Sequence, residues 1–365
     1  MNVKSFKPFH LASLAAKTMG VVAARRFGIA PRWQPIMYID VTWRCNLRCR
    51  LCSLWNNPKL DEISPERIAR YVGDAKKLGL ELVSIAGGEP MIRKDLEEIV
   101  QRISELNVSV HLDTNGAFLT PERARLLKDS GIDTVFISID GPSADIHDVY
   151  RGVDGAFQKA IAGIAAAKDA GIRTGANVLI HKANIHLLSK IASMLSNHGI
   201  EMIKFFPVHF GPPYDFGSMQ INREYLSEDE INNLEKEIND LKHFLHNRKI
   251  IFGSDAYLDS IADFFRGRPN HLTCMAGFLS TTITPDGKMC ACYPLKSFVS
   301  IGDHSFDKVF RSEKMNDIRK MVGKCTQNCW EYCHAEVSIL ASPIHAIRNP
   351  WIVMSAMQQY LKVSE

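Results

Sequence analysis

The sequence predicts an α/β protein, a partial (β/α)6 barrel followed by a C-terminal cysteine-rich extension. From residue 36 to residue 210, short β-rich runs alternate six times with helical stretches, and this alternation is typical of βαβ units and a parallel sheet. Six of the nine cysteines then gather between residues 274 and 333. Six units are too few for a closed eight-stranded barrel, so we expect an open one whose active site lies on the loops that follow the strands.

Each expected strand is a β-rich run, and the six runs are residues 36–42, 81–87, 108–116, 134–141, 173–180 and 202–208. The helices expected between them are residues 64–80, 94–107, 120–132, 155–172 and 184–200. Ser64 and Pro65 supply a cap and a first-turn proline for the first of these helices. After the barrel, residues 227–249 predict a charged helix, and residues 281–294 predict a β-hairpin that turns at residues 285–287.

These elements divide the chain into five expected segments. They are a basic apolar N-terminal arm (1–35), the barrel (36–210), a helical linker (211–270), the cysteine-rich domain (271–335) and an apolar C-terminal helix (336–365). Six basic residues and no acidic one precede Asp40, although the whole chain has a net charge of only +4. The rest of the chain is therefore slightly acidic, and we expect no nucleic-acid partner.

The composition is that of an ordinary globular protein, with 46% hydrophobic and 23% charged residues. Uninterrupted apolar runs all fall short of the roughly 18 to 20 residues that span a bilayer. The cysteines are odd in number and lie in three clusters, which disfavours a disulfide framework and favours metal ligands in a reducing compartment. We therefore predict a cytoplasmic protein.

Three cysteines with the spacing C-x3-C-x2-C, Cys45, Cys49 and Cys52, directly follow the first expected strand. Three thiolates from one loop can hold three irons of a [4Fe–4S] cluster and leave the fourth iron open to a small molecule. The triplet alone leaves two alternatives: a zinc ion with a remote fourth ligand such as His111, or buried cysteines that bind no metal.

A Gly-Gly-Glu-Pro turn follows the second expected strand, one βα unit after the triplet. The two glycines let the backbone approach a ligand closely. The triplet and this turn together resemble the radical S-adenosylmethionine (SAM) superfamily. The resemblance implies that the triplet binds the catalytic [4Fe–4S] cluster, and that the turn backbone receives the amino group of S-adenosyl-L-methionine. The turn consists of Gly87, Gly88, Glu89 and Pro90.

The resemblance continues at the ends of the next strands. Thr114 and Asn115 belong to a Thr-Asn-Gly turn that matches one near the cofactor, and Ser138 and Asp140 match a position that contacts the ribose. Arg151 is expected to reach the cofactor carboxylate, with a solvated loop charge as the alternative. A further candidate on the fifth strand is Asn177, and one departure from the family pattern is Leu51, where an aromatic residue is usual.

The C-terminal cysteines resemble a SPASM or twitch domain, an extension that carries auxiliary [4Fe–4S] clusters. Cys274 and Cys292 satisfy its opening pattern, C-x12-G-x4-C. A complete SPASM domain has seven cysteines for two clusters, and this chain offers at most six, so we expect one auxiliary cluster of twitch type. Two of three further thiols would complete its ligands, and the sequence does not select among Cys325, Cys329 and Cys333. Cys290 is expected to be no ligand, and four thiolates also suit zinc.

The family resemblance implies a reaction class. Reductive cleavage of SAM gives a 5′-deoxyadenosyl radical that removes a hydrogen atom from an unactivated substrate carbon, aided by the auxiliary cluster. It also implies an electron donor such as flavodoxin or ferredoxin.

The N-terminal arm indicates which class of substrate to expect. Its apolar stripe, at Leu11, Leu14, Thr18 and Val22, lies among basic residues, which predicts peripheral contact with the inner face of a membrane and a small-molecule or lipid-linked substrate. The alternative is that both termini pack against the barrel. A peptide-modifying maturase is a second function, although the 35 residues before the first strand are few for a leader-recognition domain. A non-catalytic zinc or iron–sulfur scaffold is a third, and the cofactor motifs argue against it.

Overall fold

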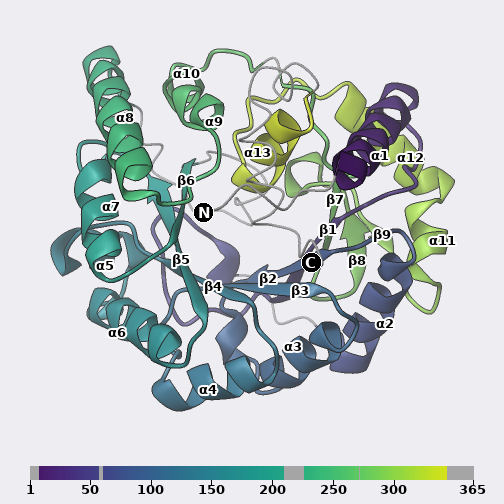
Figure 1. Ribbon diagram of the computed structural model, residues 1–365, viewed down its shortest axis with the longest axis horizontal. Coiled ribbons are helices and arrows are strands. Elements are labelled where there is room, and N and C mark those ends of the chain that lie inside the picture. The colour runs from purple at the N-terminus through teal and green to yellow at the C-terminus, as the bar shows by residue number, and fades with distance from the viewer. Residues whose placement is uncertain (1–7, 57–60, 209–225, 271, 343–365) are drawn as a thin grey trace.

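The protein is built around one nine-stranded sheet, seen in a computed structural model that describes residues 8–56, 61–208, 226–270 and 272–342. The strand order is β6-β5-β4-β3-β2-β1-β7-β8-β9 (Figure 1). The first six strands pair in parallel with their neighbours, which confirms the predicted open barrel. They are β1 (Ile36–Thr42), β2 (Leu82–Gly87), β3 (Ser109–Thr114), β4 (Thr134–Ser138), β5 (Arg173–Ile180) and β6 (Met202–Pro207).

Helices cover the outer face of the parallel strands (Figure 1). They are α2 (Pro65–Lys76), α3 (Leu96–Ser104), α4 (Pro121–Asp129), α5 (Ala144–Arg151), α6 (Ala156–Asp169) and α7 (Leu188–Asn197). The Ser64 side chain accepts a hydrogen bond from the Arg67 backbone at 3.4 Å, as expected of the predicted cap. Helix α5 is an addition, because the sequence predicted a loop there. After β6 come α8 (Glu228–Arg248), α9 (Asp255–Asp259) and α10 (Ile261–Phe265).

The cysteine-rich part continues the same sheet. Strand β7 (Ser280–Ile283) pairs in parallel with β1, and β8 (Lys288–Cys290) and β9 (Val299–Ser300) follow in antiparallel order. The predicted hairpin is present, and Gly287 in its turn has a φ of +78°, which glycine adopts without strain. The sequence did not predict the join to β1.

The remaining helices are α1 (Pro8–Phe27), α11 (Phe306–Phe310), α12 (Glu313–Gly323) and α13 (Tyr332–Leu340). Of these, α11 packs against α2, α1 packs against α12, and α13 packs against α9 and β6. Helix α13 contacts β6, and the Tyr38 hydroxyl of β1 donates to the Cys333 carbonyl at 3.1 Å. Because β1 and β6 are the first and last strands of the six-stranded barrel, α13 spans its open side (Figure 1). Three short 3-10 helices lie in loops: η1 (Leu54–Asn56), η2 (Pro90–Ile92) and η3 (Tyr293–Leu295).

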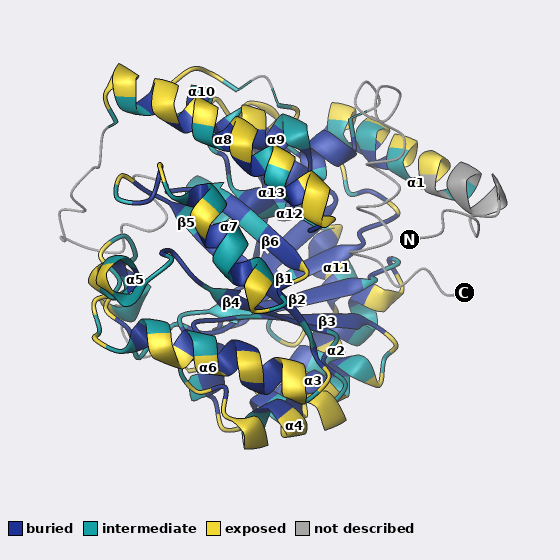
Figure 2. Ribbon diagram, turned by 60° about the vertical axis from the view of Figure 1, so that its left-hand side comes forward, coloured by how far each residue is buried: buried dark blue, intermediate teal, exposed yellow. Residues whose placement is uncertain are grey.

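The N-terminal helix packs against α12 of the cysteine-rich part, and its Lys17 lies over the Trp33 ring, just before the first strand. Val21 and Ala24 are buried there, whereas Met19 and Phe27 are exposed (Figure 2). The side chains of Leu11 and Leu14, part of the predicted stripe, lie outside the described residues, as do residues 343–365 of the predicted C-terminal helix. Among the helices described, none has the length and apolar character to cross a membrane.

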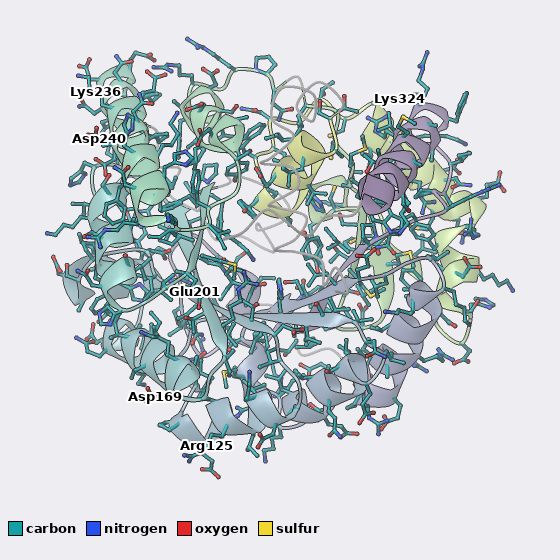
Figure 3. The ribbon with its side chains drawn as sticks, in the orientation of Figure 1. Arg125, Asp169, Glu201, Lys236, Asp240 and Lys324 are labelled. Carbon is teal, nitrogen blue, oxygen red and sulfur yellow. The ribbon has the colours of Figure 1, made fainter. Side chains whose placement is uncertain are left out.

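Charged side chains of both signs project from the outer helices and loops. The labelled examples in Figure 3 are all exposed, and they are Arg125, Asp169, Glu201, Lys236, Asp240 and Lys324. The apolar side chains of the strands and of the inner helix faces form one continuous buried core.

Candidate functional site

A cavity lies at the C-terminal ends of the parallel strands, where the fold predicts an active site. We call it the cofactor cavity. The residues that line it come from the last residues of β2 to β5 and from the segments that follow β1 to β4, and they include Cys45, Cys49, Cys52, Gly87, Gly88, Thr114, Asn115, Ser138, Asp140 and Arg151. The structure therefore brings together residues that the sequence predicted separately, at the ends of different strands.

The three thiols of the first cluster are partly buried, and burial sets their acidity. Burial, together with neighbouring thiols, raises the pKa of Cys45 to about 11 and that of Cys52 to about 12. Without a bound metal these groups are thiols at neutral pH. A metal that binds them must therefore displace protons and stabilise the thiolates, as iron in a cluster does.

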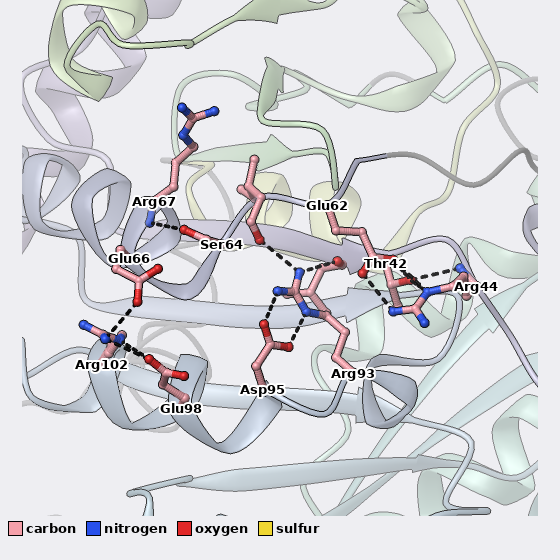
Figure 4. A network of polar contacts seen from close by, with 12 residues as sticks. Thr42, Arg44, Glu62, Ser64, Glu66, Arg67, Arg93, Asp95, Glu98 and Arg102 are labelled. Atoms are coloured by element: carbon pink, nitrogen blue, oxygen red, sulfur yellow. Dashed lines mark hydrogen bonds and ion pairs between the residues drawn. The ribbon is translucent and has the colours of Figure 1, made fainter.

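A network of polar contacts fixes the start of the loop that bears these thiols (Figure 4). Arg44 pairs with Glu62 at 2.8 Å, and its backbone carbonyl accepts from the Glu89 N–H at 2.8 Å. Beneath it, the buried Arg93 donates to the carbonyls of Val41 and Ile63 at 3.0 and 3.1 Å. The first turn after β1 is thus held from both the residues just before α2 and the turn after β2.

The two glycines after β2 are required by the protein's own packing. A Cβ atom on Gly87 would clash with the Thr42 carbonyl oxygen, and one on Gly88 would clash with the Arg44 carbonyl oxygen. Gly87 also has a φ of +137°, which disfavours other residues. From the sequence, these glycines were predicted to let the backbone approach a ligand. The structure adds that they let β2 press against the loop of the first cluster.

Glu89 ties the turn after β2 to the turn after β3. Its fully buried carboxylate accepts from the Met91 N–H at 3.0 Å, the Thr114 hydroxyl at 2.7 Å and the Asn115 N–H at 2.8 Å. Burial raises the pKa of Glu89, although these hydrogen bonds oppose the shift. The Asn115 amide in turn donates to Asn46 in the loop of the first cluster at 2.9 Å. Pro90 begins η2, which continues the turn.

Arg151 is buried and paired, so the alternative of a solvated loop charge is wrong. Its guanidinium lies 2.8 Å from one Asp140 carboxylate oxygen, and the Leu179 N–H donates to the other at 3.0 Å. Burial alone would raise the pKa of Asp140, but Arg151 and the nearby His147 and His181 reverse this and lower it. Both residues line the cofactor cavity, as does Ser138. Asn177 does not line it and instead lies on the neighbouring cavity.

This second cavity, the central cavity, lies between the barrel strands and α13. Its volume is about 370 Å³, within the range of small-molecule sites, about 300 to 1,000 Å³. It shares Ala86, Gly87 and Asp113 with the cofactor cavity, so the two are contiguous. Its wall comes both from the strands, with Asp40, and from residues after 280.

Three ionisable side chains of the central cavity, Asp40, Asp113 and Lys204, were not predicted as site residues. Asp40 accepts a hydrogen bond from Tyr293, and burial raises the pKa of Asp40 to about 6. Asp113 accepts from Ser84 at 2.8 Å, and the Lys204 ammonium lies 3.7 Å from it. Asp40 and Lys204 are each the one charged residue of a mostly apolar strand, and that interruption is the signal that could have found them.

The C-terminal cysteines separate into two groups. Cys274, Cys292, Cys325 and Cys329 line one small cavity, which we call the thiol cavity. Cys333 lines the central cavity instead, and its backbone carbonyl accepts the bond from Tyr38. Cys290 is fully buried in β8 and lines neither. All nine cysteines are free thiols.

The thiols are arranged around volumes rather than around single points. Among the described residues, no group of three or more His, Cys, Asp or Glu side chains is preformed to hold a single metal ion. In a [4Fe–4S] cluster each thiolate binds a different iron. Ligands that surround a cavity suit that demand.

Comparisons with known proteins agree with this arrangement. Residues 39–195 match the model of the radical SAM superfamily, and residues 274–334 match that of SPASM, an iron–sulfur cluster-binding domain. An AdoMet-dependent heme synthase of Nitratidesulfovibrio vulgaris is 33% identical over 162 residues, 44% of either chain. A GTP 3′,8-cyclase of Aquifex aeolicus is 34% identical over 213 residues, 55% of this chain and 64% of that one. The matches therefore span less than half of the heme synthase and less than two thirds of the cyclase.

Among solved structures, SuiB of Streptococcus suis bound to the precursor peptide SuiA aligns with a TM-score of 0.67. The alignment covers 90% of this chain and 78% of that one, with 15% sequence identity. At this identity the likeness concerns the fold alone.

Proposed function

We propose that this chain removes a hydrogen atom from an unactivated carbon of a substrate bound in the central cavity. The chain belongs to the radical SAM superfamily and carries a SPASM-type iron–sulfur domain. The observation that carries the proposal is the shared wall of the two cavities at Ala86, Gly87 and Asp113. When bound, the catalytic [4Fe–4S] cluster and SAM supply the 5′-deoxyadenosyl radical that abstracts hydrogen. A substrate in the central cavity would adjoin the place where that oxidant arises.

The chain's own residues hold and shield the reactants. In this proposal Cys45, Cys49 and Cys52 ligate the catalytic cluster, and the backbone of residues 87–90 receives the amino group of SAM. Ser138 and Asp140 face the ribose and Arg151 the carboxylate. Helix α13 covers the open side of the barrel and so limits the access of water to the central cavity.

We propose that the auxiliary [4Fe–4S] cluster is held by Cys274, Cys292, Cys325 and Cys329. The four line one cavity, and four thiolates complete the ligands of such a cluster. Cys333 then faces the substrate. Electrons would come from a one-electron donor protein such as flavodoxin or ferredoxin.

The test of the proposed function measures SAM cleavage. The reduced wild-type protein should release 5′-deoxyadenosine, and a variant with Cys45, Cys49 and Cys52 all changed to Ala should release none. The control is Cys290→Ala, which removes a buried thiol outside every cavity described above and should leave release unchanged. Equal release from the wild type and the triple variant would refute the proposal.

For the substrate we propose a lipid-linked molecule that the protein meets at an anionic membrane surface. The outward face of α1 and the turn after it supports this, because Met19, Phe27 and Ile29 are exposed beside the exposed Arg26. Apolar side chains among cations favour an anionic interface. Vesicles with anionic lipid should bind the wild type at low salt, and the Phe27→Ser, Ile29→Ser double variant should bind at least tenfold less. If the wild type ignores such vesicles, the membrane proposal fails.

Peptide modification is the second candidate, and the fold shared with SuiB, solved with a precursor peptide bound, favours it. The two candidates differ in which substrate should stabilise the protein against thermal unfolding. A peptide substrate should raise the thermal midpoint without vesicles, whereas a lipid-linked substrate should act only when presented in a vesicle or detergent micelle.

A further inference from the structure

Arg25 of the N-terminal helix contacts the backbone of a proposed auxiliary-cluster ligand. Its Nε donates to the carbonyl oxygen of Cys274 at 2.9 Å, across 249 residues of sequence. One Nη donates to the carbonyl oxygen of Val322 at 3.5 Å. The side chain also lies over the Phe278 ring, 5.7 Å from its centroid. Arg25 is thus held by three groups of the cysteine-rich part.

The two carbonyls belong to the two segments that carry the thiol cavity. Val322 lies in the last turn of α12, and its carbonyl also accepts from the Cys325 N–H at 3.3 Å. Val322 itself lines the thiol cavity together with Cys274 and Cys325. A single guanidinium therefore joins the segment that ends at Cys274 to the one that leads into Cys325.

Among the described residues, no carboxylate neutralises the charge of Arg25. Many basic side chains of the chain pair with carboxylates, as Arg266 does with Glu235, but no carboxylate among the described residues pairs with Arg25. A cluster bound by four thiolates is an anionic group, and a partly buried cation beside it favours the reduced form, which carries one more negative charge.

We propose that Arg25 is a positioning residue for the auxiliary cluster: it clamps the Cys274 and Cys325 segments together and supplies a cation that raises the cluster's reduction potential. The inference rests on the proposed ligand set. It gives the N-terminal helix a role inside the protein, on the face opposite the exposed Phe27. It also explains why neighbouring arginines differ, because Arg26 is exposed and Arg25 is half-buried.

The experiment uses the full chain with Cys45, Cys49 and Cys52 changed to Ala, so that only the auxiliary cluster remains. Into this parent we introduce Arg25→Gln, Arg25→Lys or, as the matched control, Arg26→Gln. The readouts are iron per chain, the rate at which a chelator removes iron, and the midpoint potential from a redox titration followed by electron paramagnetic resonance.

Arg25→Gln should lose iron about tenfold faster or more, because hydrogen bonds from a charged donor are lost, and its midpoint potential should fall. Arg25→Lys keeps the charge but not the two-carbonyl clamp, so its potential should stay near that of the parent while iron loss is faster. Arg26→Gln should match the parent in both.

Two results would overturn the inference, and they are distinguishable. If the parent holds no auxiliary cluster, the ligand set of the proposed function fails and the role of Arg25 fails with it. If the parent holds the cluster and Arg25→Gln matches Arg26→Gln in both potential and iron loss, only the role of Arg25 is wrong. A structural role alone would speed iron loss in Arg25→Gln and leave the potential unchanged, which refutes the electrostatic part.

Discussion

The guanidinium of Arg151 lies 2.8 Å from the carboxylate of Asp140, and the two side chains are only 15% and 3% exposed. Because a buried carboxylate that loses its partner is costly, Arg151→Gln should lower the free energy of unfolding by about 3 to 5 kcal/mol. Adding Asp140→Asn should recover much of that loss, since no unpaired charge then remains. Urea unfolding of the metal-free protein measures both.

The same variants separate stability from cofactor binding. If Arg151 meets the SAM carboxylate, the double variant should still bind SAM weakly in equilibrium dialysis although its stability has recovered. The control is Arg50→Gln, an exposed arginine in the loop after β1. Normal SAM binding by the double variant would leave Arg151 with a structural role only.

Glu89→Gln should destabilise the fold by about 1 to 3 kcal/mol. Glu89 accepts three hydrogen bonds with its two oxygens. One oxygen of Glu89 accepts from Met91 and Thr114, and the other accepts from Asn115. In glutamine an NH2 group replaces one of these oxygens, so at that position a donor would face a donor. Thermal unfolding is the measurement, with Glu98→Gln on the exposed face of α3 as the control. Equal midpoints for the two variants would contradict the anchoring role.

Iron counting tests which thiols bind the auxiliary cluster. In the parent with the first three cysteines changed to Ala, Cys329→Ala should reduce iron from about four atoms per chain to near zero. Cys333→Ala and Cys290→Ala should each retain about four, because neither thiol lines the thiol cavity. Retention of iron by Cys329→Ala together with its loss from Cys333→Ala would reverse the assignment.

Asp40 should make stability depend on pH. Burial raises its pKa from 3.8 to about 6, so as pH rises from 4 to 7 the unfolded chain ionises first and the folded state loses stability. Two pKa units correspond to about 3 kcal/mol at most. The stability of Asp40→Asn relative to the wild type should therefore increase as pH rises. The control is Asp129→Asn, at the exposed end of α4, and its stability relative to the wild type should not change in this way. A stability difference for Asp40→Asn that does not change with pH would show that this carboxyl does not titrate as described.

The six barrel strands, most of the helices between them and the motif loops were predictable because local patterns encode them. Alternating β-rich and helical runs indicate a parallel sheet, and such a sheet brings the ends of its strands to one edge. That rule is enough to gather Cys45, Gly88 and Asp140 at one cavity. The fold class and the family resemblance are confirmed.

Contacts between distant segments were not predictable. The run 280–283 looks like one arm of a hairpin, and nothing local indicates that its other neighbour is β1. The spacing of Cys325, Cys329 and Cys333 is regular, yet α13 begins at Tyr332 and turns the last thiol toward the central cavity. Arg25 is one of six basic residues in the arm, and only packing against α12 distinguishes it.

The cofactor cavity and the central cavity draw on different stretches of chain. The cofactor cavity is lined entirely by residues between Cys45 and Leu179, whereas the wall of the central cavity extends from Ile36 to Val337. Recombination between related genes could therefore exchange the last third of the chain and leave the cofactor cavity intact. The substrate range of such proteins can diversify by this route while the machinery that generates the radical is inherited unchanged.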